Sequence, residues 1–468
     1  MQTRRDQVQA QSYVLGRVTA ALVGAEPDGA ESPHRRTVTG NIAGALLAVL
    51  GVAGFVIFGM FSPGSSDSWR APGVLVVEKE TGSRFVYVNG RLHPVLNYAS
   101  ALLLFAEAPK VVTVSRKSLR EAPHGAAVGI VAAPDSLPVS GSVERQTWTV
   151  CALMSRDAAG SVVTGTALAV EATSSTGPAI PLGRGEALVV SGGGETFLIW
   201  QGRRLRMAQP WMARALGYDG AALPVEPGWL DSVPAGPDLG PALIPSRGSA
   251  GRPVDGRPAR IGSLFVARTP GAPERRFVLR PDGLAELTPL AYAIVAADPQ
   301  TTAQVYGGQP ALPRELSPGA LTQLPVSRGP VLPAGLPETP PRLRETDPAS
   351  PWCVRQDLSG AGVDIVVGSP MPEGFVVRDA VGMTRDSRTA TAVKVAAGEG
   401  GLVRPGRVDQ APGAGFYLVT DAGVKYPVAT AETAKRLGFP PGTARPVPRR
   451  LLEMLPTGPL LELAPAGG

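Results

Sequence analysis

The sequence predicts an α+β protein with a single transmembrane helix followed by an elongated extracytoplasmic region. In that region we expect four small hairpin-plus-helix repeats around a mostly β central domain with a pseudo-two-fold duplication. Three observations lead to this prediction. An uncharged apolar segment lies near the N-terminus, apolar strand pairs recur along the rest of the chain, and 57 Gly and 48 Pro in 468 residues indicate many short elements joined by turns.

Composition excludes several classes of function. The chain has 45 Lys and Arg against 39 Asp and Glu, a net charge of +6, and no block of five like charges, so nucleic acid is a poor partner. Histidines at 34, 93 and 124 and cysteines at 151 and 353 are too widely spaced for a Cys/His zinc site. We therefore expect no metal, no other cofactor and no nucleic-acid partner.

Residues 1–39 form the predicted cytoplasmic tail, and they contain an amphipathic helix. Its apolar side chains follow one stripe of the helix, and charged residues lie elsewhere on its surface. A tail this short has no domain of its own on which the stripe packs, so the stripe needs a partner protein or the bilayer surface. We favour a protein partner because the helix carries three Arg and no Lys. The predicted partner-binding residues are Arg4, Arg5, Val8, Leu15, Val18 and Leu22.

Residues 40–61 read GNIAGALLAVLGVAGFVIFGMF, which is 22 residues without a charge and long enough to cross a bilayer core of about 30 Å. A cleaved signal peptide is the alternative. It is disfavoured because 39 residues precede the segment and FSPGSSDSW after it offers no clear A-x-A cleavage site. We predict a retained transmembrane helix.

Basic residues flank this segment on one side only. Arg35 and Arg36 precede it directly, whereas the first basic residue after it is Arg70. Because positively charged flanks stay in the cytoplasm, the protein is predicted to be single-pass, with a cytoplasmic N-terminus and residues 62–468 outside the cytoplasm.

Small residues line one face of the predicted span at Gly40, Gly44, Ala48 and Gly51. Such a stripe lets a second membrane helix approach closely. The alternative is that the stripe reflects only the high Gly and Ala content of this chain.

The exterior sequence contains four copies of a unit made of two apolar strands, turns and a short helix, beginning at Gly73, Ala187, Ser263 and Gly415. The second and fourth copies also continue alike, with LGYDGAALPVEPGWLDSVPAGPDL resembling LGFPPGTARPVPRRLLEMLPTGPLL. We predict repeats at 62–110, 185–245, 261–340 and 411–462, and two halves of a central domain at 111–184 and 341–410.

The two central segments open with RQTWTVCALMS and SPWCVRQDLSG, so Cys151 and Cys353 occupy matching places. A disulfide between them would lie near the pseudo-two-fold axis and join the halves, and cysteines outside the cytoplasm are usually oxidised. Closing so long a loop would restrict the unfolded chain by about 5 kcal/mol in the chain-entropy treatment. The alternative is two unpaired buried thiols.

Motifs for catalysis are weak. The Gly-rich segment SGGGET at Ser191 has no Lys and lies where a hairpin turn is expected, and GEGGLVRPG at Gly398 neither follows a predicted strand nor fits the spacing of a phosphate-binding loop. Neither G-x-S-x-G nor H-E-x-x-H occurs. His93 and His124 each adjoin a proline in a turn-like context, and no strand-end carboxylate cluster stands out. We predict that the protein is not an enzyme.

Three stretches together resemble one family. They are RRDQVQAQSYVLGRVTAALV with the span that follows it, KETGSRFVYVNGRLHPVLNYASALLL, and LPTGPLL near the C-terminus. They resemble the EccB family, the bitopic component of actinobacterial type VII (ESX) secretion systems. The resemblance implies a cytoplasmic helix, one span, four repeats and a disulfide-linked central domain.

It also implies a structural subunit of a secretion complex that contains an EccC-type ATPase, an EccD-type and sometimes an EccE-type membrane subunit, and homo-oligomers of the chain itself. ATP hydrolysis has been attributed to some family members, but the phosphate-binding loop that would justify it is missing here. Two other functions are kept as alternatives: a cell-wall-binding membrane anchor and an exported nucleotide hydrolase.

Overall fold

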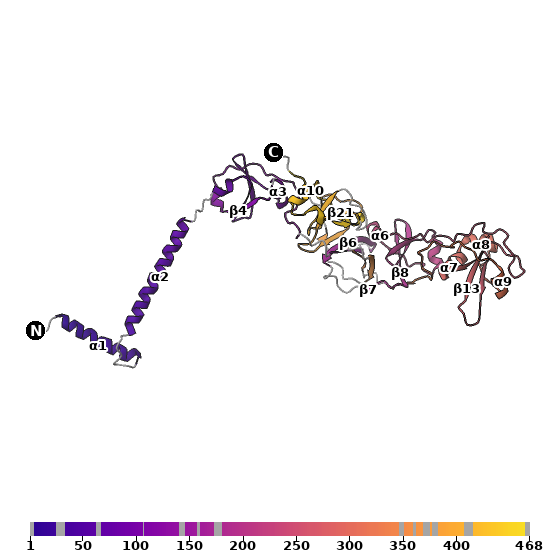
Figure 1. The fold of residues 1–468 in the computed structure, drawn as a ribbon, viewed down its shortest axis with the longest axis horizontal. Coiled ribbons are helices and arrows are strands. Elements are labelled where there is room, and N and C mark those ends of the chain that lie inside the picture. Colours follow the sequence, from indigo (N-terminus) through magenta and orange to yellow (C-terminus); the bar gives the residue numbers. More distant parts are fainter. Residues whose placement is uncertain are drawn as a thin grey trace. The chain divides into compact units, whose positions relative to one another are not determined.

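The computed structural model describes residues 4–24, 33–61, 67–105, 107–139, 146–156, 160–172, 180–345, 351–358, 362–367, 375–376, 382–406 and 415–463. The predicted boundaries at residues 1, 62, 410 and 411 lie outside these ranges. Contacts divide the chain into two compact units, one of residues 1–92 and 111–124 and one of residues 93–110 and 125–468. The fold is mixed α+β, with several small sheets (Figure 1).

Two long helices begin the chain, α1 (Arg4–Gly24) and α2 (Pro33–Phe61). Within the described residues, one helical segment is long and apolar enough to cross a membrane, Thr37–Ile57, with a mean hydropathy of 2.1. Its side chains are exposed on every side, Leu47 and Phe55 among them. A helix that is apolar all round suits a lipid environment rather than one face of a soluble core.

The first sheet has the strand order β3-β2-β1-β4. Its core in the first unit contains Trp69, Val76, Leu92 and Leu119, and the ring of Trp69 meets Tyr87 edge-on at 5.1 Å. The elements are η1 (Asp67–Arg70), β1 (Val74–Glu78), β2 (Arg84–Val88), β3 (Arg91–Pro94), β4 (Lys110–Val114) and α4 (Arg116–Leu119).

Three further sheets have the same order of strands, with the first strand antiparallel to the second and parallel to the fourth. The second sheet has β8 (Glu186–Gly192), β9 (Glu195–Trp200), β10 (Arg203–Arg206) and β11 (Leu223–Pro224), with β16 (Arg342–Leu343) beside β8. The third has β12 (Leu264–Ala267), β13 (Arg275–Arg280), β14 (Gly283–Leu287) and β15 (Arg314–Glu315). The fourth has β21 (Gly401–Pro405), β22 (Phe416–Val419), β23 (Lys425–Val428) and β24 (Arg445–Val447).

Short helices follow the third strand of each sheet, and several begin with a capping side chain. Asn97, Thr288 and Thr430 each accept a hydrogen bond from a backbone N–H of the first turn. Helix α3 contacts α10, and α5 contacts α7. The helices are α3 (Tyr98–Leu103), α5 (Trp211–Ala215), α6 (Pro227–Ser232), α7 (Pro289–Ala297), α8 (Pro299–Tyr306), α9 (Pro318–Gln323), α10 (Ala431–Arg436), η4 (Pro441–Thr443) and α11 (Arg449–Glu453).

A seven-stranded central sheet has the order β19-β20-β6-β5-β17-β18-β7. Its apolar face packs with α6 and α11 in one core that includes Trp148, Leu168, Trp229 and Leu451. Helices α6 and α11 also contact each other. The strands are β5 (Gln146–Arg156), β6 (Val162–Ala172), β7 (Ile180–Pro181), β17 (Trp352–Asp357), β18 (Gly362–Val367), β19 (Phe375–Val376) and β20 (Ala392–Val395).

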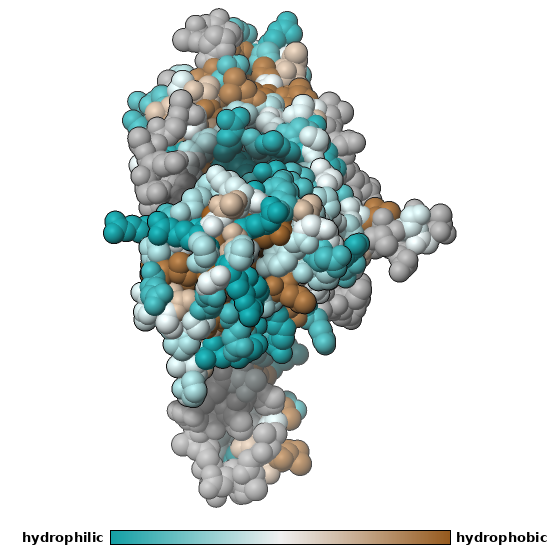
Figure 2. Space-filling view, turned by 90° about the vertical axis from the view of Figure 1, so that its right-hand side faces the viewer, coloured by the Kyte–Doolittle hydropathy of each residue, from teal (hydrophilic) through white to brown (hydrophobic). Residues whose placement is uncertain are grey.

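The face of the second unit that carries the third sheet is mainly hydrophilic, with small apolar patches between polar side chains (Figure 2). In the β12–β13 loop and at the start of β13, Arg268 and Arg275 are about half exposed or more. Arg275 pairs with Glu286 and lies 5.1 Å from the ring centre of Phe277, so its guanidinium is held over the sheet surface.

Candidate functional site

The predicted partner-binding residues all lie on α1, and its apolar stripe is exposed. Val8, Leu15, Val18 and Leu22 have 63%, 63%, 50% and 80% of their surface accessible, and Arg4 and Arg5 are exposed as well. Exposing four aliphatic side chains costs about 1.5–3 kcal/mol each relative to burial. The stripe is therefore an apolar surface that the described residues leave open.

The predicted small-residue stripe lies on α2. A methyl group added at Gly40, Gly44 or Gly51 would meet no atom within 4 Å, and Ala48 is exposed. The face is open to a second helix, and its small side chains would let that helix come close.

The two cysteines form a disulfide at the centre of the central sheet. Cys151 on β5 lies directly opposite Cys353 on β17 in antiparallel register, with Cα atoms 4.0 Å apart. Both residues are fully buried, with Ala167 and Val366 beside them. The predicted bond is confirmed, and it joins the hairpin β5–β6 to the hairpin β17–β18.

Both histidines outside the predicted span and tail have local structural contacts. His93 Nδ1 lies 2.9 Å from the carbonyl oxygen of Ala126, and the His124 ring meets Phe85 edge-on at 5.8 Å. The segment SGGGET forms the β8–β9 turn, where Gly193 and Gly194 have positive φ. Its glycines therefore serve a hairpin turn.

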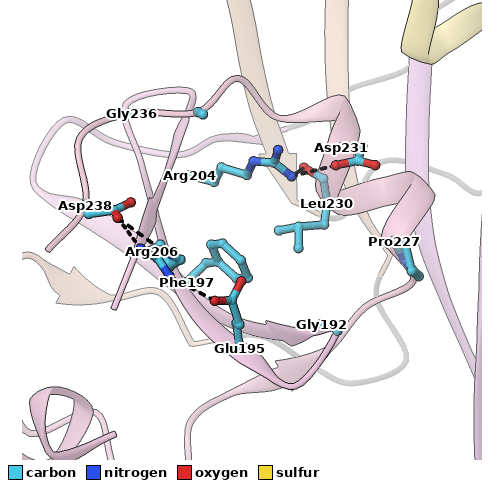
Figure 3. Close-up of a pocket in the computed structure, with 12 residues that line it drawn as sticks. Gly192, Glu195, Phe197, Arg204, Arg206, Pro227, Leu230, Asp231, Gly236 and Asp238 are labelled. Atoms are coloured by element: carbon cyan, nitrogen blue, oxygen red, sulfur yellow. Dashed lines mark hydrogen bonds and ion pairs between the residues drawn. The ribbon is translucent and has the colours of Figure 1, made fainter. Parts of the chain in front are cut away.

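A cavity of about 370 Å³ opens beside the second sheet, a feature that the sequence analysis did not predict. It lies between β9, β10, α6 and the segment that follows α6 (Figure 3). Phe197 and Leu230 supply its apolar surface, and both are nearly buried. The residues around it are Gly192, Gly193, Glu195, Phe197, Arg204, Arg206, Pro227, Leu230, Asp231, Ala235, Gly236 and Asp238.

Arg206 holds one side of the cavity together. Its Nε and Nη2 donate to Asp238 Oδ2 at 3.1 and 2.5 Å, and its Nη1 donates to Glu195 Oε1 at 3.1 Å. These carboxylates, Asp238 first, raise the pKa of Arg206 above its ordinary value. The three side chains are about half exposed, so the cluster is a fixed polar wall in contact with solvent.

Arg204 forms the other polar wall. Its Nη1 donates to the carbonyl oxygen of Leu230 at 2.8 Å and to Asp231 Oδ1 at 2.9 Å. Arg204 and Arg206 are two residues apart on β10, so both side chains leave the same face of the strand. In Figure 3 the two walls flank Phe197, and Leu230 points into the space between them.

Within the described residues, no group of three or more His, Cys, Asp or Glu side chains is placed to hold a metal ion. Sequence reasoning missed the cavity because its residues come from four separated segments. The only local signal was the alternation in RRLR, which is also typical of an ordinary exposed strand.

An apolar helix of membrane-spanning length, a set of small sheets and a central disulfide define a membrane protein with a large β-rich portion. A family profile described as type VII secretion system ESX-1, transport TM domain B, matches residues 1–467. The chain belongs to this family, the EccB components of type VII secretion systems. The family resemblance is thereby confirmed.

Known relatives match along most of their length. The chain is 29% identical to the ESX-3 secretion system ATPase EccB3 of Mycolicibacterium smegmatis over 480 residues, which cover 98% of this chain and 89% of the relative. It is 28% identical to the ESX-1 secretion system ATPase EccB1 of Mycobacterium tuberculosis, over 98% of this chain and 93% of the relative.

Solved structures share the fold. An EccB3 dimer from the ESX-3 core complex matches with a TM-score of 0.62 and 25% identity, over 83% of this chain and 98% of that one. A chain of an intact ESX-5 inner membrane complex matches with a TM-score of 0.65 and 24% identity, over 100% of this chain and 95% of that one.

Proposed function

We propose that this chain is a structural subunit of a type VII secretion complex, anchored by α2 with its N-terminus in the cytoplasm and residues 62–468 outside. Membership of the EccB family carries this proposal. Arg35 and Arg36, at the start of α2 and ahead of its apolar segment Thr37–Ile57, support the orientation. The disulfide supports it as well, since disulfides persist mainly outside the cytoplasm.

In this proposal α1 docks on neighbouring subunits through its exposed stripe, Val8, Leu15, Val18 and Leu22, with Arg4 and Arg5 at the helix start. An EccC-type ATPase and EccD-type or EccE-type membrane subunits are the proposed partners. The exposure of these aliphatic residues supports the role, because a partner's apolar surface would remove them from water.

The face of α2 formed by Gly40, Gly44, Ala48 and Gly51 is the proposed contact with another membrane helix. The second copy of the chain is one occupant that we propose, because a relative forms a dimer in its solved structure. The absence of any atom within 4 Å of a methyl group at the three glycines supports this, since the described helix leaves the approach open.

For the exterior we propose four repeats around a duplicated central domain. We count β4 (Lys110–Val114) with the first repeat, β16 (Arg342–Leu343) with the second and β21 (Gly401–Pro405) with the fourth, because each pairs with strands of that repeat's sheet, so the boundaries at 110, 341 and 410 given above move accordingly. The common strand order of the four small sheets supports the repeats. The register supports the duplication, because with Cys151 opposite Cys353 the proposed pseudo-two-fold axis would pass through the disulfide. The hairpins β5–β6 and β17–β18 lie on either side of it.

Docking is tested by replacing Val8, Leu15, Val18 and Leu22 with Ser in the full chain and measuring the size of the solubilised complex on a native gel. The matched control replaces Gln7, Gln9 and Gln11, exposed residues of the same helix, with Ser. The apolar variant should leave the complex while the control stays in it. A complex of unchanged size in both would refute docking through α1.

Orientation is tested with cysteines placed on either side of α2. Ser12→Cys should resist a membrane-impermeant maleimide in spheroplasts, whereas Thr269→Cys in the exposed β12–β13 loop should be labelled. The reverse pattern would overturn the proposed topology. Because the native cysteines are paired and buried, labelling reports the introduced residue.

The curated relatives carry the word ATPase in their names, so a nucleotide hydrolase is kept as the second candidate. We expect the purified full chain to show no ATP turnover above that of a preparation purified in parallel from cells lacking it. Turnover that is lost on replacing one carboxylate would favour the second candidate over a purely structural role.

A further inference from the structure

We propose that the cavity beside the second sheet, between Phe197, Leu230 and the two arginine walls, binds one unit of an uncharged saccharide. Its volume of about 370 Å³ falls in the usual range of small-ligand sites, roughly 300–1,000 Å³. The location of the ligand outside the cytoplasm rests on the proposed function, but the binding itself does not.

The charge of the cavity argues against an anionic ligand. Two arginines face three carboxylates, Glu195, Asp231 and Asp238, which leaves a formal charge of −1. Each guanidinium already donates to a carboxylate on its own wall. A phosphate or carboxylate ligand would therefore have to displace an existing ion pair and meet three negative groups.

The unused hydrogen-bonding atoms suit hydroxyl groups. Each of the three carboxylates has one oxygen that accepts from an arginine. The second oxygen of each, Asp238 Oδ1, Glu195 Oε2 and Asp231 Oδ2, accepts no hydrogen bond from the described residues. Hydroxyl groups both donate and accept, so a polyhydroxyl ring can meet the carboxylate oxygens and the remaining guanidinium N–H groups together.

The apolar surface between the walls completes the match. Phe197 and Leu230 lie between the walls in Figure 3, and a pyranose ring has a C–H face that packs on such a surface while its hydroxyls point sideways. The arrangement of an apolar floor with a few convergent polar groups is typical of specific small-molecule sites.

The scaffold does not require these charges, because the same positions are filled differently in the other sheets. The carbonyl oxygen of Arg206 accepts a hydrogen bond from the N–H of Leu239, and those of Pro94 and Pro427 accept the corresponding bonds in the first and fourth sheets. In the second sheet Asp238 immediately precedes the donor Leu239. In the first and fourth sheets Ala127 and Leu460 immediately precede the corresponding donors, Val128 and Leu461.

The third sheet keeps only part of the cluster, with the signs reversed. There Arg275 on β13 pairs with Glu286 on β14, in the positions that Glu195 and Arg206 occupy on β9 and β10. The N–H of Ser327 donates to the carbonyl oxygen of Leu284, as the N–H of Gly236 donates to that of Arg204 in the second sheet. Gly329 lies two residues after Ser327 and therefore takes the position of Asp238, which lies two residues after Gly236. The three-membered cluster of Glu195, Arg206 and Asp238 is therefore particular to the second sheet.

The test uses the full chain, purified in a detergent without a sugar head group, because maltoside or glucoside detergents would compete for the site. Saturation-transfer NMR and calorimetry would measure binding of two probes, the β-1,4-linked trimer of N-acetylglucosamine and maltotriose. Trilysine and inorganic phosphate are the cationic and anionic comparison ligands.

At least one oligosaccharide should bind, and Asp238→Ala should weaken binding by about tenfold, or about 1.4 kcal/mol. This variant should fold, since Ala127 occupies the same place in the first sheet. Asp238→Asn, which keeps one acceptor oxygen and the shape of the side chain, should bind better than Asp238→Ala. The matched control is Glu286→Ala in the third sheet, which should bind the oligosaccharide as the native chain does.

No binding of either oligosaccharide, equal binding by native chain and Asp238→Ala, or binding of trilysine or phosphate in place of the sugars would each overturn the proposal. None of these outcomes bears on assembly of the complex, which the native-gel experiment measures. The two proposals can therefore fail separately.

Discussion

Arg204 and Lys425 occupy the same position in the second and fourth sheets, and each donates a hydrogen bond to a carbonyl oxygen near the end of a short helix. Arg204 Nη1 lies 2.8 Å from the carbonyl oxygen of Leu230 in α6, and Lys425 Nζ lies 2.5 Å from that of Leu452 in α11. Both carbonyl oxygens also accept a backbone N–H at the end of their helix, so the cation adds a second hydrogen bond and lies at the negative end of the helix dipole.

Backbone hydrogen bonds establish the equivalence. The backbone N–H of Arg204 donates to the carbonyl oxygen of Pro234, and its carbonyl oxygen accepts from the N–H of Gly236. The backbone of Lys425 makes the same two bonds, donating to Pro456 and accepting from Gly458. In the first and third sheets the corresponding residues are Leu92 and Leu284, both buried. The cation therefore occurs in the two sheets whose helices α6 and α11 cover the central sheet.

Lys425 gives a prediction for pH. Burial lowers the pKa of this amine below its ordinary value, although Asp386 and Glu453 oppose the shift. Between the lowered and the ordinary pKa the native state binds fewer protons than the unfolded state, so the contribution of Lys425 to stability rises with pH in that interval. In urea unfolding, the gap obtained by subtracting the free energy of unfolding of Lys425→Met from that of the native chain should increase as the pH rises toward the ordinary pKa of the amine.

The exposed Lys435 supplies the control, since Lys435→Met should track the native chain at every pH. A gap that stays constant for Lys425→Met would contradict the prediction. Measurements stay below about pH 10 because burial raises the pKa of Tyr218 and Tyr426 to about 12. Above their ordinary value of 10.0 the unfolded state loses these protons first, and stability falls.

Gly458 in the LPTGPLL segment should not tolerate a side chain. A Cβ there would lie 2.4 Å from Cε1 of Tyr426, whose ring is buried in the fourth sheet. Gly458→Ala should lower the free energy of unfolding by about 1–3 kcal/mol, because the ring must move within a packed core. Gly442→Ala, where the methyl group meets nothing within 4 Å, should change it by less than about 0.5 kcal/mol. Equal losses of unfolding free energy for the two variants in chemical denaturation would contradict the prediction, because they would mean that the Tyr426 ring moves aside without cost.

Loss of the Cys151–Cys353 bond should destabilise the exterior portion. The chain-entropy treatment gives about 5 kcal/mol for a loop spanning a sequence separation of 202 residues, and the Cys151→Ala/Cys353→Ala double variant should lose up to that amount. A thiol reductant should lower the melting temperature of the native chain and leave the double variant unchanged. Unreduced peptide mapping that finds two alkylatable thiols in the native chain would refute the bond.

The ion pair between Arg247 and Asp298 is buried, with side chains 7% and 3% exposed. Asp298 also accepts from the N–H of Gln300 at the start of α8. Asp298→Ala removes the carboxylate from Arg247, whose buried guanidinium then keeps the hydrogen bond to the carbonyl oxygen of Ala242 but no counter-charge, and should cost about 3–5 kcal/mol. Glu274→Ala, which removes an exposed pair with Arg268 and Arg276, should cost less than about 1 kcal/mol. If Asp298→Ala and Glu274→Ala lost similar amounts of unfolding free energy in thermal unfolding, the prediction that the buried ion pair matters more than the exposed one would be wrong.

Some of the structure was predictable because its signals are local. Two signals are visible without tertiary information: the uncharged segment that forms most of α2, and the matched Trp and Cys residues at 148, 151, 352 and 353. The α+β class followed from apolar strand pairs and turn residues. These features depend on residues close in sequence, where hydrophobic pattern and turn chemistry determine the local structure.

The remainder depends on contacts between distant segments. Strand β11 (Leu223–Pro224) and strand β15 (Arg314–Glu315) have two residues each and no apolar run, and they exist because they pair in parallel with β8 and β12. The saccharide site that we propose depends in the same way on Glu195, Arg206 and Asp238 meeting from separate segments. Their chemistry is not visible in any single stretch of sequence.

The covalent link at the centre also changes what a cut in the polypeptide would do. Every peptide bond from residue 152 to residue 352 lies inside the ring closed by Cys151 and Cys353, including the exposed β12–β13 loop. A protease that nicks this loop would leave one molecule, still carrying its membrane helix and its last sheet. The fragments would separate only after the nick had been followed by reduction.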